Sequence, residues 1–427
     1  MIKRVLFYIL IIFSFSVNFN SVYAVPSVLS ESAVLIDANS GTILAQKNAD
    51  KKMYPASLTK IMTAILAIEM GELTDVITVD DDTPHEIYGS HIALEEGEIL
   101  TLKDLLHALM LPSANDAAST IAKHYGGSLD GFVKLMNQKA KDLGAFNTNF
   151  NNPHGLHDLN HYSTAADMAL ITQYAMKNET FKKIVATTKY EIQTTNKKDE
   201  PRYFTTLNKL LFNTGYNQIL VDGVYISPYY EYATGAKTGY TPEAGNCLVA
   251  TATKDGTELI AVTMKGISLE MYQDVHNLFN YGFKEYENAI LINKDTYIKN
   301  VKITNGDSKE ISIITENDLT ALVEKDSLGD IKSNVIMDDI TLPIEKNAVV
   351  GKIEYTLNNE VIGVVNLISP ISVKSTAVES QGSIFLPIVK FIGLLILFAV
   401  VSILLLKVYN DIRIRVNRKK RRRRYNN

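Results

Sequence analysis

The order of strand-like and helix-like patterns along the chain predicts a domain that combines a sheet with helices. Residues 33–37 and 42–46 are runs of strand length that flank the turn residues Asn39-Ser40-Gly41, which predicts a β-hairpin. Apolar residues at helical spacing then predict five helices, at 55–69, 102–110, 116–125, 131–143 and 162–177.

The strand pattern returns after these helices. Residues 246–253 and 258–264 flank the turn Lys254-Asp255-Gly256, and a last helix is expected at 271–281. Strands at both ends of this segment with helices between them predict one antiparallel sheet covered by helices, an α+β architecture. We assign residues 25–285 to this first domain.

Residues 286–374 have a different pattern and are expected to form a second, smaller domain. Short β-rich runs at 311–315, 349–355 and 361–365 alternate with Gly, Asn and Asp turns, and helical periodicity is scarce. This pattern is typical of a small β-sandwich. The polar residues 375–383 that follow are expected to be a linker.

The N-terminus has the features of a secretion signal. Lys3 and Arg4 precede an apolar run at 5–13, and the small residues at 22–24 fit a cleavage site. An uncleaved membrane anchor is the alternative, but the apolar run is short for a span. We therefore expect residues 1–24 to be removed and the mature chain to lie outside the cytoplasm.

The C-terminus carries a longer apolar segment, residues 384–408, which is expected to be a transmembrane helix. An amphipathic helix on the membrane surface is disfavoured because the segment has no polar face. The tail at 409–427 contains an unbroken basic run at 418–424, which favours a cytoplasmic tail and an extracellular catalytic domain. Such a run also suits nucleic acid or anionic lipid.

Charge and cysteine content narrow the class of protein. The net charge is −4; residues 3–4 contribute +2 and residues 407–427 contribute +9, which leaves −15 between them. An acidic ectodomain is a poor nucleic-acid binder, so no nucleic-acid partner is expected. The single cysteine, Cys247, excludes an internal disulfide and lies in an apolar alternating run, where a buried thiol is expected.

Three short segments together have the spacing of one active site. They are Ser57-Leu58-Thr59-Lys60, Ser113-Ala114-Asn115 and Lys237-Thr238-Gly239. A Ser-x-x-Lys followed by Ser-x-Asn and Lys-Thr-Gly is typical of serine acyl-transfer enzymes that react with penicillins. Each segment alone is a weak signal, whereas the ordered set is specific.

The first segment pairs a nucleophile with a base. Residues three apart share a helix face, so Ser57 and Lys60 can meet. Lys60 is the only charged residue between Lys52 and Glu69, which predicts burial, and burial favours the neutral amine that a general base needs. The alternative is a capping Ser57 and a surface Lys60.

The second segment is expected at the lip of the site. There the Ser113 hydroxyl could relay a proton to the leaving amine and the Asn115 amide could hold the substrate. Pro112 and the flanking polar residues also suit an ordinary helix start, and both interpretations can hold together.

The third segment precedes a strong hairpin pattern and is expected on a strand beside the cleft. Such a strand can pair with an extended peptide, and Gly239 permits a close approach. Lys237 supplies positive charge and Thr238 a hydroxyl for a carboxylate, while the backbone N–H groups of Ser57 and Tyr240 would form an oxyanion hole. The alternative is an ordinary edge strand.

The histidines His154, His157 and His161 raise the question of a metal site. His157 and His161 are four apart but lack the Glu of a His-Glu-x-x-His motif, and they lie among Asn, Asp and Gly. A loop with ordinary histidines is favoured, and neither a metal nor another cofactor is expected.

The three motifs resemble those of the low-molecular-mass penicillin-binding proteins, which are D-alanyl-D-alanine carboxypeptidases. The resemblance extends over about residues 26–374. The further segments that fit are 54–57, 152–156, 162–165, 237–241 and 243–245.

This resemblance implies a β-lactamase/transpeptidase-like fold and removal of the terminal D-alanine from peptidoglycan stem pentapeptides, with inhibition by β-lactam antibiotics. It implies that Ser57 is the nucleophile, Lys60 its base and Ser113 a proton relay. The residues implied in substrate binding are Asn115, Lys237, Thr238, Gly239 and Tyr240, with Lys237 and Thr238 on the terminal carboxylate.

The sequence departs from the family at one point. Members commonly carry an arginine that helps to hold the carboxylate at the start of the last helix of the first domain, and that position falls near Met271 here. Lys265 is a candidate substitute. The rival functions are a D,D-endopeptidase of cross-links, a non-catalytic wall-binding scaffold and a β-lactamase, the last disfavoured because no Glu-x-x-x-Asn lies between Ser113 and Lys237.

Overall fold

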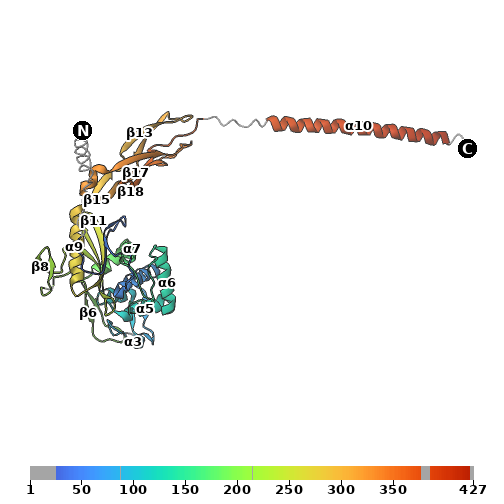
Figure 1. Cartoon of the computed structure of the whole chain (residues 1–427). Helices are drawn as coiled ribbons and strands as arrows, with labels where there is room; N and C mark the ends of the chain where they lie inside the picture. The colour runs from blue at the N-terminus through green and yellow to red at the C-terminus, as the bar shows by residue number, and fades with distance from the viewer. Residues whose placement is uncertain (1–25, 87, 214, 377–384, 424–427) are drawn as a thin grey trace, which may run out of the picture. The chain divides into compact units, whose positions relative to one another are not determined.

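The computed structural model describes residues 26–86, 88–213, 215–376 and 385–423 (Figure 1). The expected signal peptide and nearly all of the expected linker lie outside these ranges. The chain divides into two compact units. One comprises the chain up to Asn293 with Asp318–Asn334 and Glu354–Val364, and the other comprises Lys294–Asn317, Val335–Ile353 and Val365–Asn427.

A five-stranded antiparallel sheet forms the centre of the first unit, in the order β2-β1-β11-β10-β9. Both predicted hairpins are confirmed, and the strand that carries Lys237-Thr238-Gly239 lies at the edge of the sheet. The strands are β1 (Ser32–Asp37), β2 (Ile43–Lys47), β9 (Ala233–Thr241), β10 (Gly245–Lys254) and β11 (Thr257–Gly266).

The predicted cover of helices is present, and it buries both faces of the sheet. In β1, Val34 and Ile36 belong to one apolar core, and Ala33 and Leu35 belong to a second core on the opposite face. The first core packs against α2 (Lys60–Met70) and its neighbours, and the second against α9. Figure 1 shows α9 on one side of β11 and α7 on the other.

The remaining helices surround the first core or close the domain. The predicted helix at 102–110 is confirmed at both ends. The bounds are α3 (Thr83–Glu86), α4 (Leu102–Met110), α5 (Asn115–Gly126), α6 (Leu129–Asp142), α7 (Ala165–Ala175), α8 (Glu179–Ala186) and α9 (Glu270–Glu285).

Two predicted helices begin later than expected, and a further helix was not predicted. The helix expected from residue 55 begins with a 3₁₀ turn, η1 (Ala56–Thr59), and α2 begins only at Lys60. The helix expected from residue 162 begins at Ala165, because the Thr164 side chain accepts a bond from the Asp167 N–H at 3.0 Å. Helix α8 was not predicted, although the Asn178 side chain caps its first turn.

Short two-stranded sheets lie outside the central sheet in the described part of the chain. They pair β3 (Val76–Thr78) with β4 (Ile99–Thr101), β5 (Lys189–Ile192) with β6 (Arg202–Thr205), and β7 (Ile219–Val221) with β8 (Val224–Ile226).

The region after α9 is rich in strands, as predicted. The expected runs at 311–315, 349–355 and 361–365 lie within β14, β17 and β18. A two-stranded sheet pairs β12 (Tyr286–Ile292) with β15 (Leu319–Glu324). The short 3₁₀ helix η2 spans Lys325–Asp330. A five-stranded sheet has the order β13 (Tyr297–Lys302), β14 (Glu310–Thr315), β18 (Glu360–Ile368), β17 (Val349–Leu357) and β16 (Lys332–Met337).

The last helix, α10 (Phe385–Arg423), contains a stretch, Val389–Arg415, that is long and apolar enough to cross a membrane. Its apolar side chains from Val389 to Ile414 are exposed, which is the pattern of a helix surrounded by lipid. The helix is therefore consistent with membrane association.

Candidate active site

Ser57 and Lys60 meet at the start of α2. Ser57 lies half-buried in the turn η1, and Lys60 is fully buried as the first residue of the helix. Lys60 Nζ is 3.0 Å from Ser57 Oγ, 2.7 Å from Asn115 Oδ1 and 2.7 Å from the His154 carbonyl oxygen. The first two motifs are thus joined at one nitrogen atom.

The surroundings of Lys60 favour the neutral amine. Burial, with a further contribution from the nearby Lys237 charge, lowers the pKa of Lys60 well below its usual value, and Asp116 opposes this shift. No side-chain capping bond is present at η1 or at α2, so Ser57 is not a helix cap. The alternative of a surface lysine is wrong as well.

The turn that carries Ser57 is held by contacts from the histidine-containing loop. Ala56 has a φ of 48°, and a Cβ at Gly155 would lie 1.8 Å from the Ala56 carbonyl oxygen, so only glycine fits there. Thr59 Oγ1 donates to that same carbonyl oxygen at 2.8 Å. His161 Nε2 lies 2.8 Å from Thr59 Oγ1.

The buried histidines of this loop, His154 and His161, are neutral. The Asn151 N–H donates to His161 Nδ1 at 3.0 Å, so the ring hydrogen is on Nε2 and points to Thr59. Burial lowers the pKa of His161 to about 4 and that of His154 to about 3. Among the described residues no group of three His, Cys, Asp or Glu side chains could hold a metal ion.

Ser113 lies on the turn before α5, with a φ of 67° and an exposed fraction of 4%. The helix start expected here is present, but Ala114, not Ser113, occupies the N-cap position and no side chain caps the helix. In the part of the chain that the structure describes, the buried Ser113 Oγ has no hydrogen-bond partner. A buried hydroxyl without a partner is costly unless a ligand uses it.

Lys237-Thr238-Gly239 lies on the edge strand β9, beside the turn that carries Ser57. A Cβ at Gly239 would be 3.1 Å from the Ser57 backbone nitrogen, which explains the glycine. Thr238, Gly239 and Tyr240 line a cavity of about 370 Å³ together with Ser57 and Ser113.

Lys237 itself faces the interior. Its side chain is 1% exposed, its Nζ donates to the Thr238 carbonyl oxygen at 3.0 Å, and it is not among the residues that line the cavity. Burial lowers the pKa of Lys237 to about 7. The other candidate cation, Lys265, pairs with Glu31 at 2.8 Å and does not line the cavity either.

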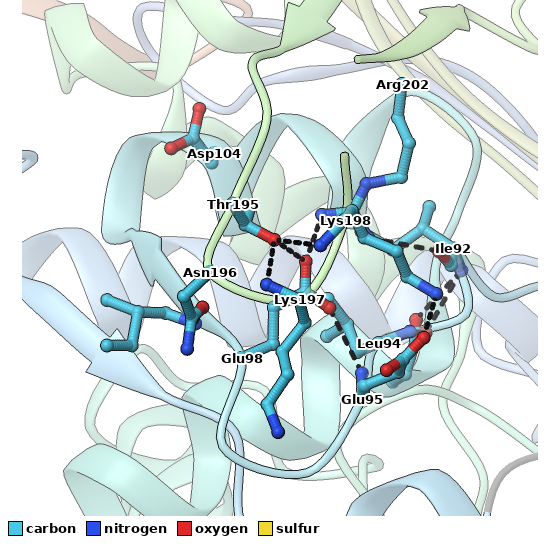
Figure 2. A network of polar contacts seen from close by, with 12 residues as sticks. Ile92, Leu94, Glu95, Glu98, Asp104, Thr195, Asn196, Lys197, Lys198 and Arg202 are labelled. Atoms are coloured by element: carbon cyan, nitrogen blue, oxygen red, sulfur yellow. Dashed lines mark hydrogen bonds and ion pairs between the residues drawn. The ribbon is translucent and has the colours of Figure 1, made fainter. Parts of the chain in front are cut away.

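A polar network links residues 92–98 to Thr195, Lys198 and Arg202 (Figure 2). The Asp116 carboxylate accepts bonds from the backbone N–H groups of Ile92 and Leu94. Arg202 donates to the Ile92 carbonyl oxygen at 3.2 Å and pairs with the fully buried Glu98 at 2.5 Å.

Two further bonds fix Asn115 next to the site. The Asn115 N–H donates to the Ser90 carbonyl oxygen at 2.7 Å, and Asn115 Nδ2 donates to the Tyr88 carbonyl oxygen at 2.6 Å. Asn115 is thereby set so that its Oδ1 points to Lys60.

The cavity also contains residues that the motifs did not indicate. Lys209, Asn246, Met271 and Tyr272 line it, the first from a segment without clear periodicity. No local signal identifies Lys209, because its place in the wall depends on contacts with a distant helix.

Comparison with known proteins agrees with this geometry. Residues 20–268, more than half of the chain, match the family described as D-alanyl-D-alanine carboxypeptidase. The chain belongs to this family. Residues 286–375 match a second family, the C-terminal domain of penicillin-binding protein 5.

Individual relatives match this chain over most of its length. The D-alanyl-D-alanine carboxypeptidase DacF of Bacillus subtilis is 34% identical over 78% of this chain and 83% of its own length. DacA of Escherichia coli is 31% identical over 79% of this chain and 82% of its own.

Solved structures show the same likeness. Penicillin-binding protein 5 from Haemophilus influenzae is 29% identical, with a TM-score of 0.65 over 82% of this chain and 99% of that one. A Streptomyces K15 DD-transpeptidase mutant is 30% identical, with a TM-score of 0.54 over 61% of this chain and 99% of its own. The resemblance seen in the sequence is confirmed: this chain is a serine-type D-Ala-D-Ala carboxypeptidase of the penicillin-binding proteins.

Proposed function

We propose that this carboxypeptidase removes the terminal D-alanine from peptidoglycan stem pentapeptides through an acyl-enzyme on Ser57. The observation that carries the assignment is the contact of a fully buried lysine with Ser57 Oγ at 3.0 Å. Ser57 Oγ attacks the carbonyl carbon between the last two D-alanines, D-alanine leaves, and water then releases the shortened peptide.

Lys60 is the general base in this proposal. A neutral amine has two hydrogens and one lone pair. Asn115 Oδ1 and the His154 carbonyl oxygen can only accept bonds, so they orient the two hydrogens. The lone pair is then directed to the Ser57 hydroxyl and can take its proton.

Ser113 is assigned the transfer of a proton to the leaving amine. Its buried Oγ borders the cavity next to Ser57 and has no partner among the described residues. Asn115 uses one N–H on the Tyr88 carbonyl oxygen, and its second N–H is assigned to the substrate amide.

The edge strand β9 is assigned to substrate binding. Its outer edge has no neighbouring strand in the central sheet, so an extended peptide can pair with it. The backbone N–H groups of Ser57 and Tyr240 would hold the oxyanion, with Gly239 allowing the close approach. The Thr238 hydroxyl is assigned to the terminal carboxylate, and Lys237 supports it from behind.

The arrangement of the whole chain is also a proposal. Residues 1–24 would be a cleaved signal, 25–285 the penicillin-binding domain, 286–374 the β-rich domain, 375–383 a linker and 384–408 the membrane span. The basic tail at 409–427 would remain cytoplasmic and the catalytic domain extracellular, because basic residues next to a span favour the cytoplasmic side.

The test uses the mature chain and its Ser57→Ala variant, each incubated with a penicillin and measured by intact mass. We expect a stable adduct on the wild type only, and D-alanine release from an acyl-D-Ala-D-Ala peptide by the wild type only. An adduct on both proteins would assign the wrong serine. The absence of both adduct and D-alanine from the wild type would favour the scaffold, and release from cross-linked dimers alone would favour the endopeptidase.

A further inference from the structure

The cavity next to Ser57 is also lined by residues that the motifs do not explain. They are Leu207, Lys209, Ser268, Leu269, Met271 and Tyr272. Among the described residues that line the cavity, Lys209 is the only one with a charged side chain. The single cation on the wall is therefore one that no motif marks.

Helix α9 holds the segment that carries Lys209. The Tyr272 hydroxyl donates to the Leu207 carbonyl oxygen and accepts from the Lys209 N–H, both at 3.2 Å. Tyr272 is 1% exposed and belongs to the core between the sheet and α9. One buried ring thus fixes the position of this backbone relative to the cavity.

One side-chain bond orients Lys209 within the part of the chain that the structure describes. Its Nζ donates to Asn217 Oδ1 at 3.0 Å, and the residue is half-buried. An ammonium group has three N–H donors, so a bond to Asn217 can aim the group while further donors remain for a ligand.

The substrate requires such a group. A carboxypeptidase substrate ends in a carboxylate, and a carboxylate that enters a pocket is stabilised best by charge-assisted hydrogen bonds. Lys237 is buried behind Thr238 and Lys265 is paired with Glu31, so neither presents its ammonium group to the cavity. Met271, which also lines the cavity, is apolar.

We propose that Lys209 recognises the terminal carboxylate of the substrate, together with the Thr238 hydroxyl, and that Asn217 positions its ammonium group. This inference rests on the proposed acylation of Ser57 in the same cavity. It makes Lys209 a determinant of selectivity for peptides with a free C-terminus, whereas the chemistry of bond cleavage stays with Ser57 and Lys60.

The test compares two thioester substrates with the same acyl-D-alanyl part. The leaving group of one ends in a carboxylate, and that of the other ends in the methyl ester. A thioester is activated, so both substrates can be turned over without optimal binding. For Lys209→Met we expect kcat/KM to fall about 10- to 100-fold on the carboxylate substrate, the range of a lost charge-assisted bond, and less than about 3-fold on the methyl ester.

Two further variants sharpen the result. Lys209→Arg keeps the charge and should retain most of the preference for the carboxylate substrate. Lys265→Met removes a cation that does not face the cavity, and it should leave both substrates unchanged. An equal loss on both substrates, or no loss on either, would overturn the proposal.

The Ser57→Ala variant separates this proposal from the one on which it rests. If Ser57→Ala retained turnover of both thioesters, the acylation proposal would fail, whatever Lys209 does. If Ser57→Ala were inactive and Lys209→Met kept the wild-type preference, only the role of Lys209 would be wrong. Thermal unfolding of each variant identifies any that fails to fold.

Discussion

The surroundings of two lysines at the active site are built differently. Lys60, beside Ser57, is fully buried and makes three polar contacts. Lys209, on the wall of the cavity, is half-buried and Asn217 holds its ammonium group by one bond. Proton transfer requires a desolvated amine in a fixed position, whereas recognition of a carboxylate requires a charged amine with donors to spare. In the two proposals the same residue type therefore has two roles, which differ in the burial of the side chain and in the number of its polar contacts.

The largest effect is expected from removal of the buried lysine, Lys60. Lys60→Met should lower kcat for D-alanine release by about 10⁴-fold, because Ser57 loses its general base. The control Lys197→Met removes an exposed lysine and should leave kcat unchanged. Steady-state assays on an acyl-D-Ala-D-Ala peptide measure both. Retention of activity in Lys60→Met would assign the base to another group.

The second test concerns the polar network that links residues 92–98 to Arg202. Glu98→Ala removes one partner of a buried ion pair and should lower the free energy of unfolding by about 3–5 kcal/mol, because Arg202 loses its counter-charge. Urea unfolding measures the change.

The matched control is Glu95→Ala, whose partner Lys198 forms a more exposed pair. Its loss should be much smaller, because solvent screens an exposed ion pair. Similar losses in the two variants would show that the Glu98–Arg202 pair is no more important than a surface contact.

The third test concerns the histidine that supports the Ser57 turn. The pKa of His161 is about 4 in the folded chain and 6.5 without burial. As the pH falls, the unfolded chain therefore binds this proton before the folded chain does. The contribution of His161 to stability is fully present above about pH 6.5 and is lost as the pH falls to about 4. Below that pH this group causes no further loss. The loss is at most about 3 kcal/mol.

His161→Gln keeps a donor for Thr59 but does not titrate. We expect it to be less stable than the wild type at pH 7 and to lose less stability between pH 6.5 and 4. Urea unfolding at several pH values measures this difference. The pKa of His154 is also lowered by burial. Protonation of His154 therefore still lowers the stability of the variant as the pH falls. An unchanged slope would show that His161 is not the group that titrates.

The smallest expected effect distinguishes proton relay from simple packing at Ser113. Ser113→Ala should lower kcat/KM by about 100-fold on a peptide, whose amine must leave with a proton, but by less than about 10-fold on a thioester. The thiolate leaves without that proton. A parallel loss on both substrates would indicate that Ser113 only shapes the cavity.

Much of the fold could be predicted from short-range patterns. The hairpins formed where turn residues separate two strand-length runs, and helix 102–110 was predicted at both ends. The helix expected from residue 55 was wrong in its first turn. Contacts from Gly155 and Thr59 hold Ala56 in a conformation that an α-helix does not contain, and these contacts bring in the distant loop with His161.

The same distinction between local spacing and tertiary contacts applies to the candidate site. The sequence by itself determined that Ser57 and Lys60 share one face and that Lys237-Thr238-Gly239 lies on a strand, because both follow from the spacing of neighbouring residues. Only the tertiary structure decided that Lys237 faces inward, that Lys265 pairs with Glu31 and that Lys209 enters the cavity. Those outcomes depend on packing between segments far apart in the chain, such as Tyr272 against Lys209, and local spacing carries no information about such contacts.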